Sequence, residues 1–475
     1  MRPPSAPLPP ARVRDVFQFF DDSRPASGFT RREWLRVGSL GAAGATLPQL
    51  MESRPQAAAS GKAKSCIVLF LLGAPPQQET WDPKPDSPVE YRGDLSTIPT
   101  SIPGFRCGEL MPKTAAWADK LAILRAVRTG DNAHSTSGYY MCTGVPHIPQ
   151  QLENAAPGFP NDHPTLGGIL RKLRPSIGAI PSAITLPETA ANDGGKTWPG
   201  QDAGFLGREC DPWVLAGDPS AKNFEVADLA LPMGVAGERF DGRHQLLKEL
   251  DRRVAHAERG GSLERFNAWQ RQAFDLVRSP QARKAFDLSQ ETPATRERYG
   301  MNRFGQSVLL SRRLVEAGVP LVQVNWTRIE GAVNNGHWDT HTKNTEALRN
   351  WLMPRMDQAY TALLEDLRDR GLWDETLVVW TGEFGRTPKI NQVAGLDHWG
   401  NVFSLALSGA GIKQGCIHGE SDRLAAEPVA GMVRPEDVMA TIFHTLGIPP
   451  TTMVTDRSGR THQISRGRVI REVLA

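Results

Sequence analysis

Three side chains that can bind a metal ion lie within five positions of this 475-residue chain. They are His337, Asp339 and His341, in the sequence Asn-Asn-Gly-His-Trp-Asp-Thr-His that follows a run of strand-forming residues. If the segment is helical, the two histidines share a face, because positions four apart coincide on a helix. Imidazole and carboxylate groups are ligands of zinc and similar divalent ions. The spacing therefore predicts a divalent metal site, with zinc as the ion.

A further candidate ligand, His398, follows another apolar run, at residues 377–380. Glu383 follows the end of that run, and a Gly-Arg-Thr-Pro loop that contains Arg386 comes next. Open α/β sheets bind ligands beyond the carboxyl ends of their strands. We therefore expect Glu383 near the metal as ligand, partner or base, and Arg386 in contact with an anionic substrate. The alternatives are that His398 belongs to a loop cap and that Glu383 and Arg386 form a structural ion pair.

Hydroxyl side chains open an expected helix near residue 135. Ser135 and Thr136 come soon after the expected strand at 121–127. A hydroxyl at a helix start is either a cap or, in an active site, a nucleophile. We expect the attacking group to be one of these hydroxyls or a water molecule bound at the metal. His134, in the same run, and His163 are weaker candidate ligands.

Short apolar runs rich in β-branched residues predict the strands that position these side chains. The runs lie at 66–72, 121–127, 183–186, 321–326 and 377–380, and helical sequence falls at 113–120, 165–173, 304–317 and 436–446. Strands that alternate with helices predict an α/β fold, with a mostly parallel sheet and helices on both faces. Charged, periodic sequence at 241–299 predicts a helical insertion in a single domain that spans 61–475.

Composition excludes some classes of partner. The net charge is +3, without a basic block, so we expect no nucleic-acid binding. The five cysteines form no Cys-x-x-Cys pair, which argues against a thiolate zinc site. Beyond the first sixty residues, no run reaches the ~18 apolar residues of a membrane span. We therefore expect no membrane span in the mature protein.

The first sixty residues resemble a twin-arginine export signal. Arg31 and Arg32 precede a weakly apolar, Gly/Ala-rich run at 37–47, and Ala-Ala-Ala at 57–59 offers a small-residue cleavage site. We expect residues 1–60 to be a signal and disordered leader, and the mature protein to be periplasmic or otherwise exported. The alternative is a disordered tail with a chance pair of arginines.

The order of these parts resembles a family of exported bacterial proteins of unknown function, which is similar to the alkaline phosphatase and sulfatase superfamily. The most specific segments are Gly-Glu-Phe-Gly-Arg-Thr-Pro at 382–388 and Gly-Gln-Asp-Ala-Gly-Phe-Leu-Gly at 200–207. The resemblance covers most of residues 65–450. It implies an alkaline phosphatase-like fold and a metal-dependent activity on phosphate or sulfate esters.

Carried over to this chain, the superfamily's ligand pattern survives only in part. One metal position, Asp-x-x-x-His with a distant His, corresponds to His337, His341 and His398, with Asp339 nearby. At the second position, the expected aspartate falls near Gly73 and an Asp-His pair becomes Glu383-Phe384. The Cys/Ser-x-Pro-x-Arg signature of formylglycine sulfatases is absent near residue 134.

Two functional hypotheses follow from these observations. The first is an exported hydrolase with one divalent metal and a small anionic substrate. The second is a non-catalytic exported protein that keeps the fold and uses the cleft for binding. Metal content and ester hydrolysis distinguish them.

Overall fold

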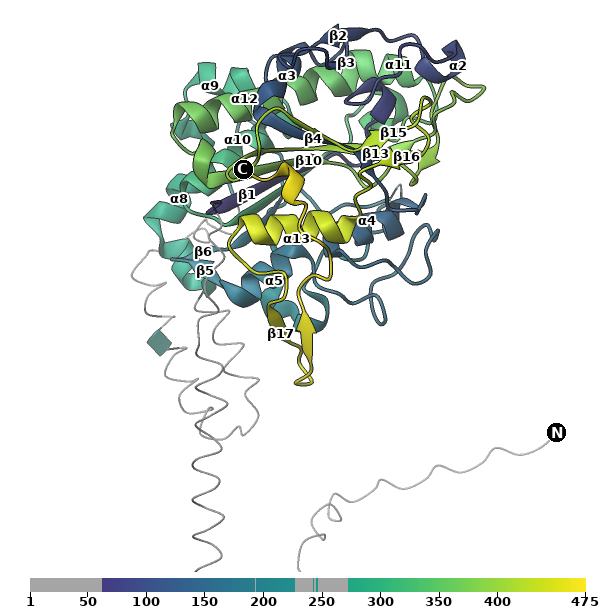
Figure 1. Ribbon diagram of the computed structural model, residues 1–475. Coiled ribbons are helices and arrows are strands. Elements are labelled where there is room, and N and C mark those ends of the chain that lie inside the picture. The colour runs from purple at the N-terminus through teal and green to yellow at the C-terminus, as the bar shows by residue number, and fades with distance from the viewer. Residues whose placement is uncertain (1–61, 193, 227–241, 243–244, 247–271) are drawn as a thin grey trace, which may run out of the picture. The chain divides into compact units, whose positions relative to one another are not determined.

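The computed structural model describes residues 62–192, 194–226, 242, 245–246 and 272–475 (Figure 1). The expected export segment lies outside the described residues, and so does nearly all of the expected insertion before residue 272. The described end of the insertion contains helices α8 (Pro280–Phe286) and α9 (Pro293–Tyr299). Within the described ranges, no helix combines the length and apolar character that a membrane crossing requires.

One eight-stranded sheet organises the described chain, in the order β14-β4-β13-β10-β1-β9-β7-β8. Its strands are β1 (Ser65–Phe70), β4 (Leu121–Val127), β7 (Ala183–Leu186), β8 (Trp213–Val214), β9 (Leu321–Asn325), β10 (Thr376–Thr381), β13 (Phe403–Gly409) and β14 (Cys416–His418). The strands are parallel except β13, which pairs antiparallel with both β10 and β4. β1, β10 and β13 are buried along their whole length, as expected for strands covered on both faces.

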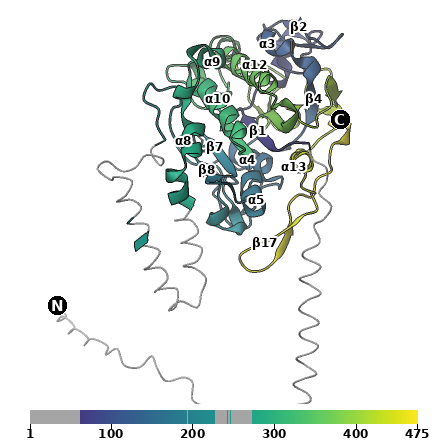
Figure 2. The same ribbon diagram turned by 90° about the vertical axis from the view of Figure 1, so that its left-hand side faces the viewer.

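Helices cover both faces of the sheet (Figures 1 and 2). On one face, α10 (Arg303–Glu316) contacts β1 and β9 and packs against α12 (Met353–Asp369). On the other face lie α4 (His134–Thr143), α5 (Leu166–Leu173) and α13 (Pro435–Thr445); α13 contacts α4, and α5 contacts β7. This arrangement confirms the predicted α/β fold with a mostly parallel sheet.

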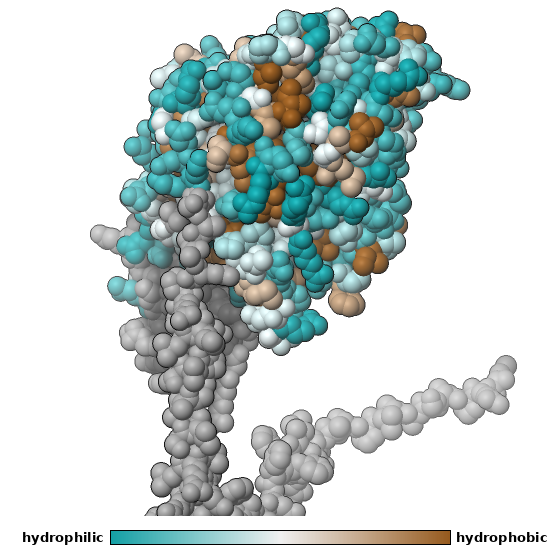
Figure 3. All heavy atoms as spheres, in the orientation of Figure 1, coloured by the Kyte–Doolittle hydropathy of each residue, from teal (hydrophilic) through white to brown (hydrophobic). Residues whose placement is uncertain are grey.

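Shorter elements complete the described chain. They are α2 (Val89–Arg92), α3 (Pro112–Ala115), α11 (Asn344–Ala347), and the two-stranded pairs β2 (Thr97–Pro99) with β3 (Arg106–Gly108), β5 (Ser176–Ile177) with β6 (Ile180–Pro181), β11 (Gly385–Arg386) with β12 (His398–Trp399), β15 (Glu420–Ser421) with β16 (Pro428–Ala430), and β17 (Met453–Thr455) with β18 (Thr461–Gln463). On the face shown in Figure 3, hydrophilic residues predominate and apolar residues form small groups.

Candidate metal centre

The candidate centre lies beyond the carboxyl ends of three parallel strands. His134 is the first residue of α4, which follows β4. Asp339 and His341 lie in the segment after β9, and His398 lies on β12, which follows β10. Loops at this edge of a parallel sheet converge, so residues far apart in the sequence meet there.

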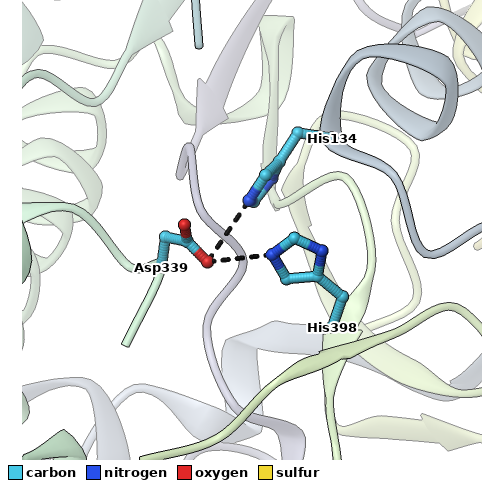
Figure 4. Close-up of side chains that lie close together, drawn as sticks. All are labelled: His134, Asp339 and His398. Carbon is cyan, nitrogen blue, oxygen red and sulfur yellow. Dashed lines mark hydrogen bonds and ion pairs between the residues drawn. The ribbon is translucent and has the colours of Figure 1, made fainter. Parts of the chain in front are cut away.

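Three imidazole nitrogens converge on one carboxylate oxygen. Asp339 Oδ1 is 3.2 Å from His134 Nε2, 2.9 Å from His341 Nε2 and 3.1 Å from His398 Nε2. Figure 4 shows His134 and His398 pointing at Asp339 from two different elements. Ligand atoms of these three residues all lie within 4.8 Å of one another. His341 Nε2 is also 2.9 Å from His398 Nε2. Imidazole and carboxylate donors at such short separations fit a single divalent cation.

Each of the three histidines uses its other ring nitrogen for an outer contact. Nδ1 of His134, His341 and His398 is 2.7 Å from Glu383 Oε1, Asp397 Oδ1 and the carbonyl oxygen of Asn132, respectively. A carbonyl oxygen can only accept, so Nδ1 of His398 carries a proton. An ionised carboxylate is also only an acceptor, so Nδ1 of His134 and of His341 carries a proton as well. In neutral rings, the lone pairs therefore lie on the converging Nε2 atoms. Such outer acceptors fix the tautomer of metal-ligating histidines.

The loop after β9 presents Asp339 and His341 to the centre because its side chains alternate. Trp338 and Thr340 are fully buried, whereas His337, Asp339 and His341 are only partly buried. The backbone of His337 is extended, at φ −91° and ψ 159°, so the segment is not the helix that would place His337 and His341 on one face.

Gly73 allows this loop to approach the end of β1. Its φ is +98°, and a Cβ atom at this position would lie 2.3 Å from the backbone nitrogen of Asp339. Any larger residue would push the loop away from the sheet, since both the backbone conformation and the space require glycine.

Arg386 holds Asp339 in place through a buried contact. Its side chain is fully buried, and Nη2 lies 2.6 Å from Asp339 Oδ1. The guanidinium also donates to the carbonyl oxygens of Gly73, Ala74 and Leu396. The β11–β12 ladder pairs Arg386 directly with His398, which fixes both residues at the centre. Because Arg386 is enclosed by protein, its geometry favours positioning Asp339 over contacting a substrate.

The charges at the centre shift the pKa values of its groups. Burial alone would raise the pKa of Asp339, but the charge of Arg386 and hydrogen bonds from the histidines hold it well below its usual range. Burial alone would lower the pKa of His134, yet its hydrogen bonds to Asp339 and Glu383 raise that pKa to about 9. The hydrogen bond to Asp339 raises the pKa of His341, whereas burial lowers the pKa of His398.

Glu383 acts through His134. Its side chain is fully buried, and Oε1 accepts from the Gly73 amide at 2.8 Å as well as from His134. The other oxygen, Oε2, has no hydrogen-bond partner among the described residues. This arrangement is that of a carboxylate that orients a histidine.

A cavity of about 410 Å³ opens onto the centre. His134, Asp339, His341 and His398 form one wall, and the other lining side chains include Glu153, Trp198, Arg328, Asn335 and His337. Trp198 stacks on His134, with ring centroids 5.9 Å apart and an interplanar angle of 14°. Among the described residues, the lining of this cavity includes no serine, threonine or cysteine.

The structure separates the predicted hydroxyls from this cavity. Ser135 Oγ donates to the Leu152 carbonyl oxygen at 2.8 Å and accepts from the Ala155 amide, so it holds a loop. Thr136 Oγ1 is buried and has no partner among the described residues. His337 lines the cavity together with the ligand candidates. His163 lines a different cavity. His134, a weaker candidate than His337 from the sequence, reaches Asp339 together with His341 and His398.

These features define an α/β protein with a centre of three histidines and one aspartate at the carboxyl edge of its sheet. The chain belongs to the family described as "Protein of unknown function (DUF1501)", which matches residues 63–474. This match confirms the resemblance to a family of unknown function. Comparison with curated proteins finds no match.

Several solved structures are similar to this chain at low identity and low TM-score. The PsFucS1 sulfatase from Pseudoalteromonas sp. is 13% identical, with a TM-score of 0.40 over 90% of this chain and 72% of that chain. The phosphonate monoester hydrolase SpPMH from Silicibacter pomeroyi is 13% identical, with a TM-score of 0.37 over 86% and 76%. A protein in the alkaline phosphatase superfamily from Vibrio parahaemolyticus is 12% identical, with a TM-score of 0.35 over 87% and 71%. At these values the similarity carries no argument about activity.

Proposed function

We propose that this protein is an exported, metal-dependent hydrolase that acts on small phosphate or sulfate esters. The observation that supports the proposal is the convergence of three Nε2 atoms on Asp339 Oδ1, with every Nδ1 held by an outer acceptor. The Nε2 atoms of His341 and His398 lie 2.9 Å apart, so in the absence of a cation one of them carries a proton and donates it to the other. A cation bound by both nitrogens would take the place of that proton.

The donor set fits zinc, which binds imidazole and carboxylate ligands. His134, Asp339, His341 and His398 would hold the ion. When bound, zinc polarises an ester oxygen and lowers the pKa of water in the site. The protein's own contribution is to keep the ligands oriented and to bind the anionic group of the substrate. Arg328 is the guanidinium that lines the cavity, and it is the residue we assign to that anion.

We infer one cation and not two. At the second metal position of the superfamily, Gly73 has no side chain and the fully buried Phe384 packs its ring 4.8 Å from that of His134. Glu383 is engaged by the Gly73 amide and His134. With a single ion and neither Ser135 nor Thr136 at the cavity, water is the attacking group that we propose.

The same observations favour a second candidate, a non-catalytic binding protein. A cavity whose described lining contains no hydroxyl or thiol nucleophile and no second metal position still suits the capture of a small anion. The two candidates differ in whether an ester bound in the cavity is hydrolysed.

Metal content and hydrolysis of the mature protein test both candidates. We expect about one divalent ion per chain by elemental analysis, and its loss in His341→Asn but not in the control His444→Asn, which lies on α13. The metal-loaded protein should hydrolyse at least one of a panel of 4-nitrophenyl phosphate mono- and diesters and sulfate. Bound metal without hydrolysis would favour the binding protein. Purified protein that contains no metal and does not bind added zinc would exclude both a metal-dependent hydrolase and a metal-dependent binding protein.

Export is tested separately. The proposal rests on the sequence of residues 1–60, which lie outside the described residues. Replacing Arg31 and Arg32 by lysine should leave uncleaved precursor inside the cell, and unchanged export would contradict a twin-arginine signal.

A further inference from the structure

A second cavity, of about 320 Å³, lies away from the metal centre. It is enclosed by the last turn of α4, the start of α5 and the β17–β18 hairpin. Figures 1 and 2 both show α5 next to β17. In the part of the chain that the structure describes, the two cavities have no lining residue in common. α4 carries His134 at its first position and Thr143 at its last, so its ten residues separate the two sites by about 15 Å.

The segment 200–207, one of the two most specific in the sequence, builds this second cavity. Gly204 has a φ of +47°, and a Cβ atom there would lie 1.9 Å from the carbonyl oxygen of Asp162. This close approach lets the Phe205 amide donate to the same carbonyl oxygen at 2.7 Å. Phe205 is thereby held against His163, with ring centroids 5.6 Å apart. The glycines place an aromatic wall in the cavity, and the metal centre makes no use of it.

The cavity combines this aromatic wall with basic side chains. His462, on β18, stacks on Phe205 with ring centroids 4.2 Å apart and an interplanar angle of 24°. Arg466 lines the cavity and forms no hydrogen bond or ion pair with any described residue. The buried side chains of Ile169 and Ile464 form an apolar floor. Small-molecule sites have this composition, with a mainly apolar lining and a few polar groups that converge.

Charge identifies the kind of ligand. Burial lowers the pKa of His163; the negative charge of Asp162 opposes this shift, and the positive charges of His462 and Arg466 add to it. The one carboxylate in the lining, Glu436, already accepts a hydrogen bond from the Tyr140 hydroxyl. Across the residues that the structure describes, the metal-ligand cluster contains none of these side chains. His462 is already paired with Asp456, at 2.9 Å. Arg466 has no such partner among the described residues, so an anion would compensate its charge, whereas a metal ion would find too few ligands.

We propose that this cavity is a second binding site, for a small organic anion with an apolar body. Its carboxylate, phosphate or sulfonate group pairs with Arg466, beside the rings of His163 and His462, and its apolar part lies against the aromatic wall and the isoleucine floor. The proposal does not rest on the metal centre or on hydrolysis.

Calorimetric titration with benzoate and benzenesulfonate, which offer no ester to hydrolyse, tests the site. Benzamide, which has the same apolar body without the charge, is the matched neutral probe. We expect Arg466→Gln to weaken binding of the anions about tenfold, because a charge-assisted contact is lost. Arg468→Gln, two residues further along and paired with Glu472 at 3.1 Å outside the cavity, should leave binding unchanged. Saturation should raise the pKa of His163 in an NMR titration.

Three outcomes would overturn the proposal. The first is that neither anion binds at millimolar concentration. The second is that Arg466→Gln binds as the wild type does, or that Arg468→Gln weakens binding equally. The third is that His341→Asn, a change at the metal centre, abolishes binding, because the anion would then occupy the other cavity.

Discussion

Replacement of Glu383 by alanine removes the acceptor that two buried donors share. The Gly73 amide and His134 Nδ1 lie 2.8 and 2.7 Å from Glu383 Oε1, and both would be left without it. A buried donor without a partner costs about 1–3 kcal/mol, so the two together cost about 2–6 kcal/mol. Part of this loss is offset, because the alanine variant also lacks Oε2, and burial of that unpartnered atom destabilises the wild type. We therefore expect a destabilisation of about 2–4 kcal/mol.

The same change should weaken metal binding, because His134 loses the contact that orients it. Loss of an outer carboxylate typically reduces metal affinity 10–100-fold. Guanidinium unfolding of the metal-free protein measures the first effect, and competition with a chelator measures the second. Glu383→Gln retains an acceptor oxygen and should show less than half of each effect. Glu330→Ala, an exposed glutamate in the loop after β9, serves as the control and should stay within about 0.5 kcal/mol of the wild type.

One result would refute this reasoning. If the free energy of unfolding of Glu383→Ala lies within about 0.5 kcal/mol of the wild-type value, the two hydrogen bonds do not stabilise the folded state. If it is destabilised but binds metal as tightly as the wild type, Glu383 supports the fold without orienting His134.

Three further changes test other parts of the structure. Arg386→Lys should destabilise the protein by about 3–5 kcal/mol in guanidinium unfolding, because it breaks the buried contact with Asp339; an effect below about 1 kcal/mol would contradict the positioning role. Burial raises the pKa of Glu79 to about 7. The free energy of unfolding of the wild type should therefore fall as pH rises from about 4.5 to 7, because the buried carboxyl group loses its proton. Relative to the wild type, Glu79→Gln should be up to about 3 kcal/mol more stable at pH 8 than at pH 4. A constant difference across that range would refute it. Gly204→Ala should lower the free energy of unfolding by more than about 2 kcal/mol, whereas Gly178→Ala, also at positive φ but in open space, should lower it by only about 1 kcal/mol. Equal losses of stability in thermal unfolding would show that the close contact at Gly204 does not contribute.

Much of the sheet could be predicted from local sequence. β4 and β7 begin and end where their apolar runs do, and β1, β9 and β10 differ by one or two residues at their ends. β13 was not predicted. Its sequence, Phe-Ser-Leu-Ala-Leu-Ser-Gly, contains two serines in a strand that is buried throughout, and its antiparallel place between β10 and β4 depends on tertiary pairing. The long helix α12, which follows a π-helical turn at Leu348–Leu352, was also not named from the sequence.

The candidate site was predicted only in part, for a different reason. Asp339, His341 and His398 stand at strand ends in the sequence, and the structure brings them together. His134 was ranked lower because one histidine at a helix start is usually structural. Its position, seven residues after β4, could have indicated the site, since the other ligands also follow strands. The burial of Arg386 could not be predicted, because a loop sequence does not show which way a side chain turns.

The spread of the ligands over three strands links metal content to folding. His134 lies 249 residues before Glu383, its outer partner, and Asn132 lies 266 residues before His398. No short fragment contains the centre, and closing loops of this length has to wait until the sheet joins β4 to β10 through β13. Metal should therefore not nucleate the fold, but should slow unfolding by binding the finished sheet. In a preparation of this protein, the ratio of bound metal to chain would then count the molecules whose sheet is complete.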